Sequence, residues 1–412
     1  MSDRIPTEFQ YFENIRKPAN KIRLKALAWM YGVKTFLPDD VIHTWATSYY
    51  DADPVAEQFI ADVYMKRGQA AGRAMVDQAL QHGVASVPDA PESMKTLFAE
   101  IEQLPSWVDW DKVELGARVF RRYGPRLYTL LGSITLDAYQ ENSVSKPLVL
   151  TGAYAGESAN RRFLETAGFW RDVSLPGGMK TGGPGLSTAV RVRLMHVFVR
   201  KGLLRHPQWD LEAWGMPISQ GDALLTLVAG SIGPAYGMRF MGYRTTNEEI
   251  EAMMHFWRYV GCVMGVQPRW YPETVGDAVR LLGASFIKGP KKAGEDGRNL
   301  AHSYIQSFAP GENDTGFQLW RKKLDYWMEL GTTWFYLPGP TYKRHRLPSP
   351  GLWGLHPIAR FPVNFALETI RQHSRWADDF RDRQVQKDSE RWLAFHLGQR
   401  AAEYHAVESF TR

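Results

Sequence analysis

The stretch that decides the fold is residues 160–200, NRRFLETAGFWRDVSLPGGMKTGGPGLSTAVRVRLMHVFVR. Both ends of the stretch have a helical pattern, so we expect one helix at the start and a second that ends at Arg200. The glycine-rich residues 177–185 lie between the two helices. We expect this segment to act as a flexible link that brings the helices together, with Ser187 or Thr188 capping the second one. His196 lies in the apolar body of that second helix. Its apolar neighbours on one helix face are Val192, Met195, Val199 and Leu203.

The remainder of the chain has the same helical character. Alternating strand patterns are rare and short, so the sequence predicts an all-α fold. Ser219-x-x-Asp222 and the run from Thr246 to Glu249 are typical helix starts. Leu224, Leu225, Leu227 and Val228 suggest a fully buried helix. Residues 375–408 are expected to form a charged amphipathic helix, or two.

Three segments are expected to lie outside helices. Residues 147–156 read as a short connection, 289–297 as an exposed loop, and the basic cluster 343–346 as a solvated loop. The loops near 83–91 and 289–297 suggest a division into an N-terminal helical extension (1–95), a core (96–288) and a C-terminal helical region packed on it (289–412).

The composition narrows the class of protein. The 412 residues are 44% hydrophobic and 23% charged, an ordinary globular balance. The formal net charge of +6 is spread along the chain, which argues against a nucleic-acid partner. Cys262 is the single cysteine, so an intrachain disulfide and a cysteine-based zinc or iron–sulfur site are excluded. With no secretory signal and no apolar window of ~20 residues, we expect a cytoplasmic protein.

His196 supports two interpretations. A lone histidine on an apolar face is commonly a core histidine that bonds to a backbone carbonyl. The functional interpretation is an axial ligand of a haem iron, because neutral imidazole binds iron and apolar neighbours exclude water. Arg193 or Arg200, seven residues apart on another face, would then neutralise a haem propionate or bind a partner helix.

Arg162, Glu165 and Thr166 point the same way on the first helix, at i, i+3 and i+4. One interpretation is an Arg–Glu pair on a solvated face. The other is a buried cluster, because Phe169 and residue 173 extend the same face with apolar side chains. Glu165 would then be a candidate proton donor or acceptor.

Other catalytic motifs are absent. The glycine-rich run is neither a phosphate loop nor a dinucleotide fingerprint, and His-Glu-x-x-His and Gly-x-Ser-x-Gly do not occur. An iron site of two histidines and one carboxylate stays possible, because His255 could join His196. No local spacing in the sequence supports such a site. His255 is more typical of a core or interface histidine.

The order of several motifs resembles the rubber oxygenase (latex clearing protein) and mpaB-type oxygenase catalytic-domain family, over roughly residues 107–284. The motifs are Arg162-x-x-Glu165-Thr166, Gly177-Gly178, the run 192–196 with Arg200, Pro217-x-x-Gln220-x-Asp222 and Trp257-Arg258-x-x-Gly261-x-x-x-Gly265.

The resemblance implies a globin-like helical core that holds one haem b, with His196 as the proximal iron ligand and Arg162 and Thr166 in the pocket. It also implies cleavage by dioxygen of a carbon–carbon double bond in an isoprenoid chain. Some relatives carry a lysine that ligates the iron where this chain has Glu165, so the distal side is open to question. Secreted relatives carry an export signal, so an intracellular lipid- or isoprenoid-like substrate is expected here.

Two alternatives remain from the sequence. One is a haem- or lipid-binding protein without catalysis on the same fold. The other is a peripheral membrane protein that uses its aromatic residues and the basic cluster 343–346.

Overall fold

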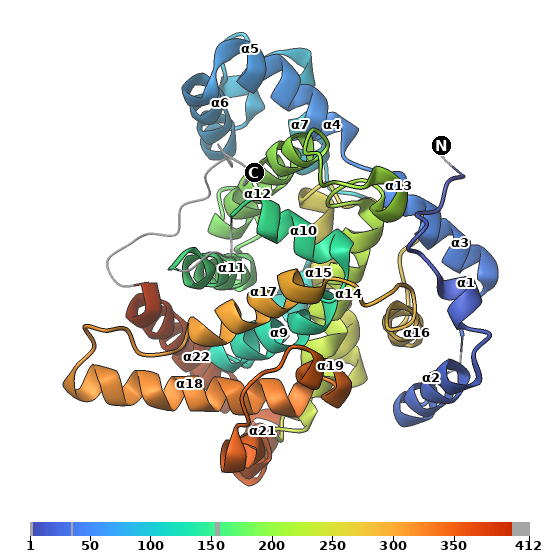
Figure 1. Cartoon of the computed structure of the whole chain (residues 1–412). Helices are drawn as coiled ribbons and strands as arrows, with labels where there is room; N and C mark the ends of the chain where they lie inside the picture. Colours follow the sequence, from blue (N-terminus) through green and yellow to red (C-terminus); the bar gives the residue numbers. More distant parts are fainter. Residues whose placement is uncertain (1–2, 34–35, 153–156, 398–412) are drawn as a thin grey trace.

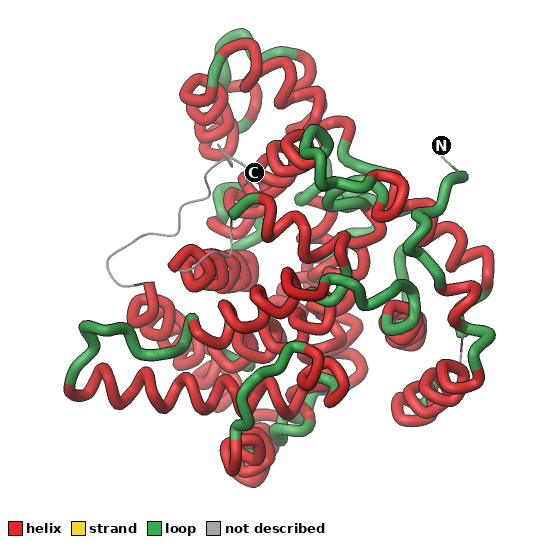
Figure 2. The backbone as a smooth tube through the Cα atoms, viewed as in Figure 1, coloured by secondary structure: helices red, strands yellow, loops and turns green. Residues whose placement is uncertain are grey.

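The computed structural model describes residues 3–33, 36–152 and 157–397, with side chains from residue 161 onward in the last range. Every regular element in those ranges is a helix (Figures 1 and 2), so the predicted all-α class is confirmed. The end of the predicted 147–156 connection and the last residues of the predicted C-terminal helix lie outside the described residues.

The N-terminal helices form one flank of the molecule, with α5 and α6 at one end of it (Figure 1). Asp53 caps α4 by accepting a hydrogen bond from the backbone N–H of Ala56 at 3.2 Å. The helices are α1 (Tyr11–Asn14), α2 (Pro18–Tyr31), α3 (Asp39–Thr47), η1 (Ser48–Tyr50), α4 (Pro54–Phe59), the π-helix η2 (Ile60–Tyr64), α5 (Met65–Arg67), α6 (Gln69–His82), η3 (Val84–Ser86) and α7 (Glu92–Glu102).

The central helices carry the motifs of the sequence. They are α8 (Trp110–Arg122), α9 (Pro125–Ala138), α10 (Asn142–Leu150), α11 (Glu157–Ser174), α12 (Pro184–Leu203), α13 (Leu211–Trp214), α14 (Gln220–Arg239), α15 (Asn247–Val263) and α16 (Val275–Ser285). Both predicted helix starts are confirmed. The Ser219 hydroxyl accepts a hydrogen bond from the N–H of Asp222, and Thr246 and Glu249 form a reciprocal capping box.

The C-terminal helices cover the end of the molecule opposite α5 (Figure 1). They are α17 (Gly294–Gln306), α18 (Gly316–Tyr336), α19 (Gly339–Arg344), η4 (Gly351–Leu355), α20 (His356–Ala359), α21 (Phe361–His373) and α22 (Arg375–Leu397).

Several local predictions are wrong. Pro147 lies inside α10, a helix of nine residues. Because proline has no backbone N–H, the helix lacks the hydrogen bond from residue 147 to the carbonyl four residues earlier. Residues 289–293 lie outside helices as predicted, but residues 294–297 form the start of α17, where Gly297 is buried against the carbonyl of Tyr139. Residues 343–346 are not a solvated loop, because α19 extends to Arg344 and His345 is buried with its Nε2 2.8 Å from the carbonyl of Leu136.

Most of the buried hydrophobic residues form one core, with members from Phe9 to Leu393. A small second cluster, of Leu150, Val199, Leu203 and Trp209, joins α10 to the end of α12. Within the described ranges, none of the helices combines the length and the apolar character needed to span a membrane. The proposed division at residues 95 and 288 stays a prediction.

Candidate functional site

Helices α11 and α12 form an antiparallel hairpin that carries His196. The Thr188 hydroxyl donates a hydrogen bond to Asp172 Oδ2 at 3.1 Å, which fixes the register of the two helices. A Cβ at Gly185 would lie 2.5 Å from the Cα of Val173, so only glycine permits this approach. Counting eight residues along each helix from the Thr188–Asp172 contact places His196 about level with residue 164.

The expected cap of α12 is wrong. The helix begins at Pro184 with Gly183 as its N-cap residue, and no side chain caps it. Proline is well suited to the first helical turn because the N–H that it lacks would have no partner there. The hydroxyl of Thr188 bonds instead to α11, as described above.

The His196 imidazole lies deep in the protein and is uncharged at neutral pH. Burial, with a smaller contribution from the Arg200 cation, lowers the pKa of His196 to about 4, against the opposite effect of Asp53. Residue His196 nevertheless keeps some accessible surface, although the adjacent Val197 is fully buried. No hydrogen bond to this ring occurs among the described residues. A neutral imidazole in this setting has a lone pair available for a metal.

Arg193 and Arg200, the two arginines proposed for a propionate, are bound to carboxylates. Arg193 donates to both oxygens of Asp53, at 2.7 and 2.9 Å, and to Glu100 at 2.6 Å. Arg200 donates to Glu57 at 3.0 Å and to the backbone carbonyls of residues 217 and 218. Of the two roles that the sequence left open, the structure favours contacts with partner helices, here α4 and α7.

Gln220 connects two other motifs of the resemblance, the one that contains Gln220 itself and the one that ends at Gly265. Its amide nitrogen donates to the carbonyls of Ala52 and Gly265, both at 2.8 Å, and its oxygen accepts from the N–H of Gln267 at 2.8 Å. A Cβ at Gly265 would lie 2.2 Å from an Asp53 carboxylate oxygen, so the glycine leaves room for the Arg193–Asp53 pair. These residues therefore join the starts of α4 and α14 to the end of α15.

The cluster on α11 is divided between buried and open positions. Glu165 is buried and pairs with Arg161 at 2.9 Å and with Arg162 at 3.7 Å. Thr166 is exposed, and its hydroxyl donates to the carbonyl of Arg162 at 3.0 Å. Phe169, one turn further, is buried against the Trp257 ring, with 6.3 Å between the ring centroids. The helix face that carries Arg162 and Thr166 is therefore accessible, and it lies next to the buried rings of Phe169 and Trp257.

Helix α14 has an open face that sequence reasoning missed. Thr226 is exposed, although Leu224, Leu227 and Val228 beside it are buried, so the prediction of a fully buried helix is wrong at this position. Gly230, one turn on, is half-buried, and a Cβ there would meet only the Trp257 ring, at 3.8 Å. The signal available in the sequence was the small and polar side chains at this spacing within an apolar helix.

Trp257 links the open faces of α11 and α14. Its ring lies between Phe169 on α11 and Gly230 on α14. The ring is buried, and its Nε1–H has no hydrogen-bond partner among the described residues. A buried donor without a partner is costly and calls for an explanation, of which a bound group is one.

His255 does not join His196. Its Nε2 accepts a hydrogen bond from the backbone N–H of Asp109 at 3.0 Å, and its ring packs against Trp107. Burial lowers the pKa of His255. In the described ranges no group of three or more His, Cys, Asp or Glu side chains is placed to hold a metal ion. Among those residues, therefore, His196 does not belong to a site of two histidines and one carboxylate.

Comparisons with known proteins agree with the motif order. The family model for "ER-bound oxygenase mpaB/B'/Rubber oxygenase, catalytic domain" matches residues 120–372. A rubber oxygenase of Streptomyces sp. (strain K30) is 25% identical over 230 residues, which cover 54% of this chain and 54% of that protein. The chain thus spans about half the length of that relative.

A solved structure shares the fold. The structure of latex clearing protein LCP in the closed state has a TM-score of 0.60 and 18% sequence identity to this chain. The match covers 86% of this chain and 92% of that one. The shared fold thus extends well beyond residues 120–372.

Proposed function

Because the chain belongs to the catalytic-domain family of mpaB-type and rubber oxygenases, we propose that it is a haem b-dependent oxygenase. Its substrates are dioxygen and a hydrophobic, unsaturated isoprenoid- or lipid-like compound. The observation that carries the proposal is His196, a deeply placed, uncharged imidazole without a hydrogen bond among the described residues. This is the state that an axial iron ligand requires.

The open positions of α11 and α14 suit a flat, largely apolar group. Thr226 and Gly230 give α14 an open face of small side chains, and Thr166 is open on α11. The Trp257 ring, whose N–H has no hydrogen-bond partner among the described residues, lies between these helices. We propose that haem b binds against these residues, with His196 as its protein ligand.

Within this proposal, the residues of α11 set the polar side of the pocket. Arg162 is partly exposed and carries the positive charge that a propionate needs. Glu165 holds Arg162 through its own carboxylate and is the candidate for moving a proton. Thr166 offers a hydroxyl on the same open face. Arg193, which the sequence also suggested for a propionate, is already bound by Asp53 and Glu100, so we assign it a positioning role.

A bound haem supplies the activation of dioxygen, and the protein supplies orientation and a dry site. Phe169 and Val192 line the neighbouring faces with buried apolar side chains, which exclude water. His196 stays uncharged down to acidic pH and so remains able to bind iron. Glu165 stands where some relatives have a lysine, so we propose that no lysine closes the distal side here.

Oxygen uptake tests the activity. The purified, haem-loaded chain is mixed with a soluble oligoisoprenoid, and dioxygen consumption and carbonyl products are measured together. We expect both, with a fall of ~10²-fold or more for Glu165→Gln if it moves a proton in the slow step. A haem complex that consumes no dioxygen with any unsaturated isoprenoid or lipid would reduce the function to binding.

A further inference from the structure

Helix α21 has the opposite of the usual amphipathic arrangement. Its polar residues Asn364 and Glu368 are buried, at 7% and 4% exposure. Its apolar residues face outward, and Val363 and Ile370 are 64% and 57% exposed. The other exposed apolar side chains of the helix are Phe361, Phe365 and Leu367. A surface helix normally turns its apolar stripe toward the core.

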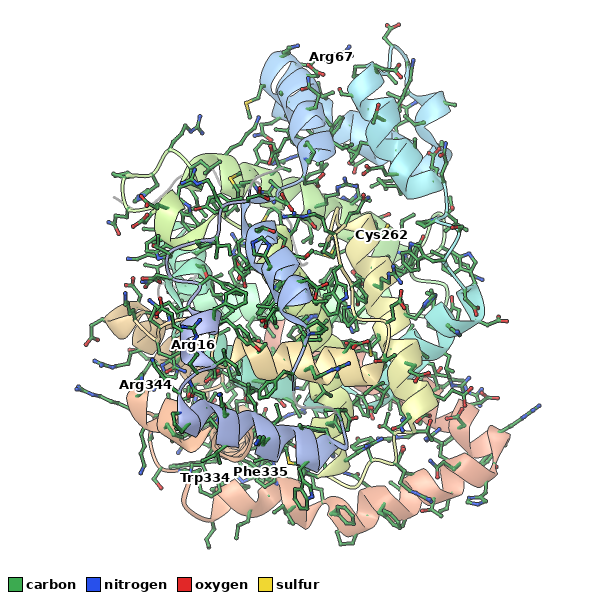
Figure 3. The ribbon with its side chains drawn as sticks, turned by 90° about the vertical axis from the view of Figure 1, so that its right-hand side faces the viewer. Arg16, Arg67, Cys262, Trp334, Phe335 and Arg344 are labelled. Carbon is green, nitrogen blue, oxygen red and sulfur yellow. The ribbon has the colours of Figure 1, made fainter. Side chains whose placement is uncertain are left out.

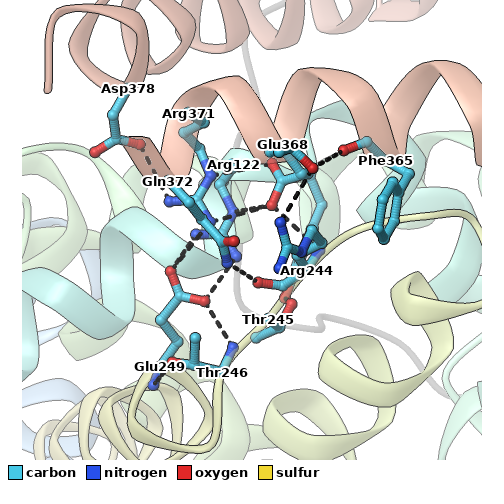
Figure 4. A network of polar contacts seen from close by, with 12 residues as sticks. Arg122, Arg244, Thr245, Thr246, Glu249, Phe365, Glu368, Arg371, Gln372 and Asp378 are labelled. Atoms are coloured by element: carbon cyan, nitrogen blue, oxygen red, sulfur yellow. Dashed lines mark hydrogen bonds and ion pairs between the residues drawn. The ribbon is translucent and has the colours of Figure 1, made fainter. Parts of the chain in front are cut away.

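The inward polar side is fixed by a buried network (Figure 4). Glu368 binds Arg371 at 3.1 Å and Arg122 of α8 at 3.7 Å, and Arg122 pairs with Glu249 of α15 at 2.5 Å. Asn364 donates to the carbonyl of Met241 at 2.8 Å. Rotating α21 to bury its apolar side would leave these charges without partners, so its outward apolar face is a built feature.

This apolar face continues over neighbouring elements. Gly331 of α18 packs against the backbone of Trp353, and Gly354 packs against the ring of Trp334. Gly242, just beyond α14, packs against the backbone of Phe361. The end surface, as we call it, consists of the exposed side chains of Trp334, Leu352, Trp353, Leu355, Ile358, Phe361, Val363, Phe365, Leu367 and Ile370. Trp334 lies at the opposite end of the molecule from Arg67 (Figure 3).

The end surface is surrounded by positive charge. Residues 338–377 contain six Lys or Arg residues and one acidic residue, the buried Glu368. Arg371 is paired with Glu368 in the inward network, which leaves five basic residues. Asp378 and Asp379, which follow, pair with Arg118 of α8. Arg360 is one of the six, and it lies near Arg126 and His356. Burial and then the Arg126 charge lower the pKa of Arg360. Among the described residues neither Arg126 nor Arg360 has a carboxylate partner.

We propose that the end surface docks on a lipid bilayer that carries anionic headgroups, with Arg126 and Arg360 receiving a headgroup phosphate. Exposed tryptophan, phenylalanine and aliphatic side chains bordered by arginine and lysine are the composition that lies in a membrane interface. Two neighbouring arginines without carboxylates supply the matching charge for phosphate. The inference does not depend on haem or on the oxygenase reaction.

A second copy of the chain is the competing occupant, and the charges argue against it. In a two-fold symmetric contact the same surface is presented by both subunits. That contact would bring two sets of basic residues together with no exposed acidic residue from 338–377 between them. Like charges across an interface are repulsive, whereas an anionic membrane neutralises them.

Vesicle co-sedimentation of the whole chain tests the proposal. We expect binding to phosphatidylcholine vesicles that contain phosphatidylserine, and weaker binding to phosphatidylcholine alone. The double variant Val363→Glu with Ile370→Glu should lose at least about tenfold in binding to both. Arg360→Gln should lose about fivefold on anionic vesicles only. Met65→Glu is the control, since Met65 is 58% exposed on α5 beside Arg67, at the far end.

Circular dichroism melting of each variant confirms that it is folded, which is expected because the altered apolar side chains are exposed. Two outcomes overturn the proposal. One is a chain that binds neither vesicle type. The other is a dimer in solution that the Val363→Glu, Ile370→Glu variant dissociates, without any vesicle binding.

Discussion

Arg193 on α12 donates two hydrogen bonds to the carboxylate of Asp53, at 2.7 and 2.9 Å, three residues before His196. The guanidinium is almost completely buried. Asp53 also caps α4, so one carboxylate holds both the start of α4 and the middle of α12. The N-terminal helices, which precede the residues matched by the family model, therefore fix the position of the proposed iron ligand.

Removing this carboxylate should destabilise the fold strongly. Asp53→Ala leaves Arg193 buried with Glu100 as its remaining acidic partner, and we expect a loss of about 3 kcal/mol in the free energy of unfolding. Urea denaturation measures it. Asp77→Ala is the matched control, because Asp77 pairs with Arg191 of the same helix at 2.8 Å on an exposed face. The control should lose less than about 1 kcal/mol, and equal losses would refute the assignment.

Glu329 should make the stability depend on pH. Burial raises its pKa from 4.5 to about 7, although Tyr304 and Ser133 donate hydrogen bonds to it at 2.7 and 2.9 Å. The folded state thus holds the proton more tightly than the unfolded state. This contribution to stability is complete below pH ~4.5 and is lost as the pH rises toward ~7.

Glu329→Gln stays uncharged, so at pH 8 it should be more stable than the wild type by up to about 3 kcal/mol, with little difference at pH 4.5. Denaturation at both pH values checks this. An equal effect at the two pH values would show that the carboxyl is not protonated in the folded state. Glu92→Gln, at an exposed carboxylate, serves as the control and should be neutral at both.

Haem binding through His196 should persist in mild acid. Since the pKa of His196 is lowered to about 4, its imidazole is uncharged at pH 5, where an ordinary histidine is mostly protonated. We expect the Soret absorbance of the complex to be constant from pH 8 to pH 5 while circular dichroism reports a folded chain. A loss of haem centred near pH 6.5 would contradict the buried, neutral imidazole.

Larger side chains at Gly230, on the open face of α14, test whether haem binds against this face. A Cβ at Gly230 would meet only Trp257, at an ordinary contact distance of 3.8 Å, so Gly230→Ala should bind haem like the wild type. Gly230→Leu should exclude haem and yet leave the melting temperature unchanged or higher, because leucine favours helix over glycine by nearly 1 kcal/mol. Undiminished haem binding by the leucine variant would place the pocket elsewhere.

The features predicted correctly from the sequence are those that depend on neighbouring residues, such as helix starts. The capping residues Ser219 and Thr246 marked the starts of α14 and α15 correctly because a cap needs only the next three residues. Asp53 was not identified as the partner of Arg193, since 140 positions separate them in the sequence. Thr226 was taken as buried because an apolar run does not reveal which of its faces borders an open space. Pro147 was taken as the start of a connection, but α10 continues through it.

The measurement that tests the central claim most directly is a hemin titration followed by absorption spectroscopy. The wild-type chain should form a 1:1 complex with a Soret band that shifts on reduction. His196→Ala should lose that band, and His255→Ala, whose ring accepts a hydrogen bond from the Asp109 N–H, should keep it. A wild-type chain that forms no such complex, or a His196→Ala spectrum identical to that of the wild type, would contradict the assignment of His196 as the iron ligand.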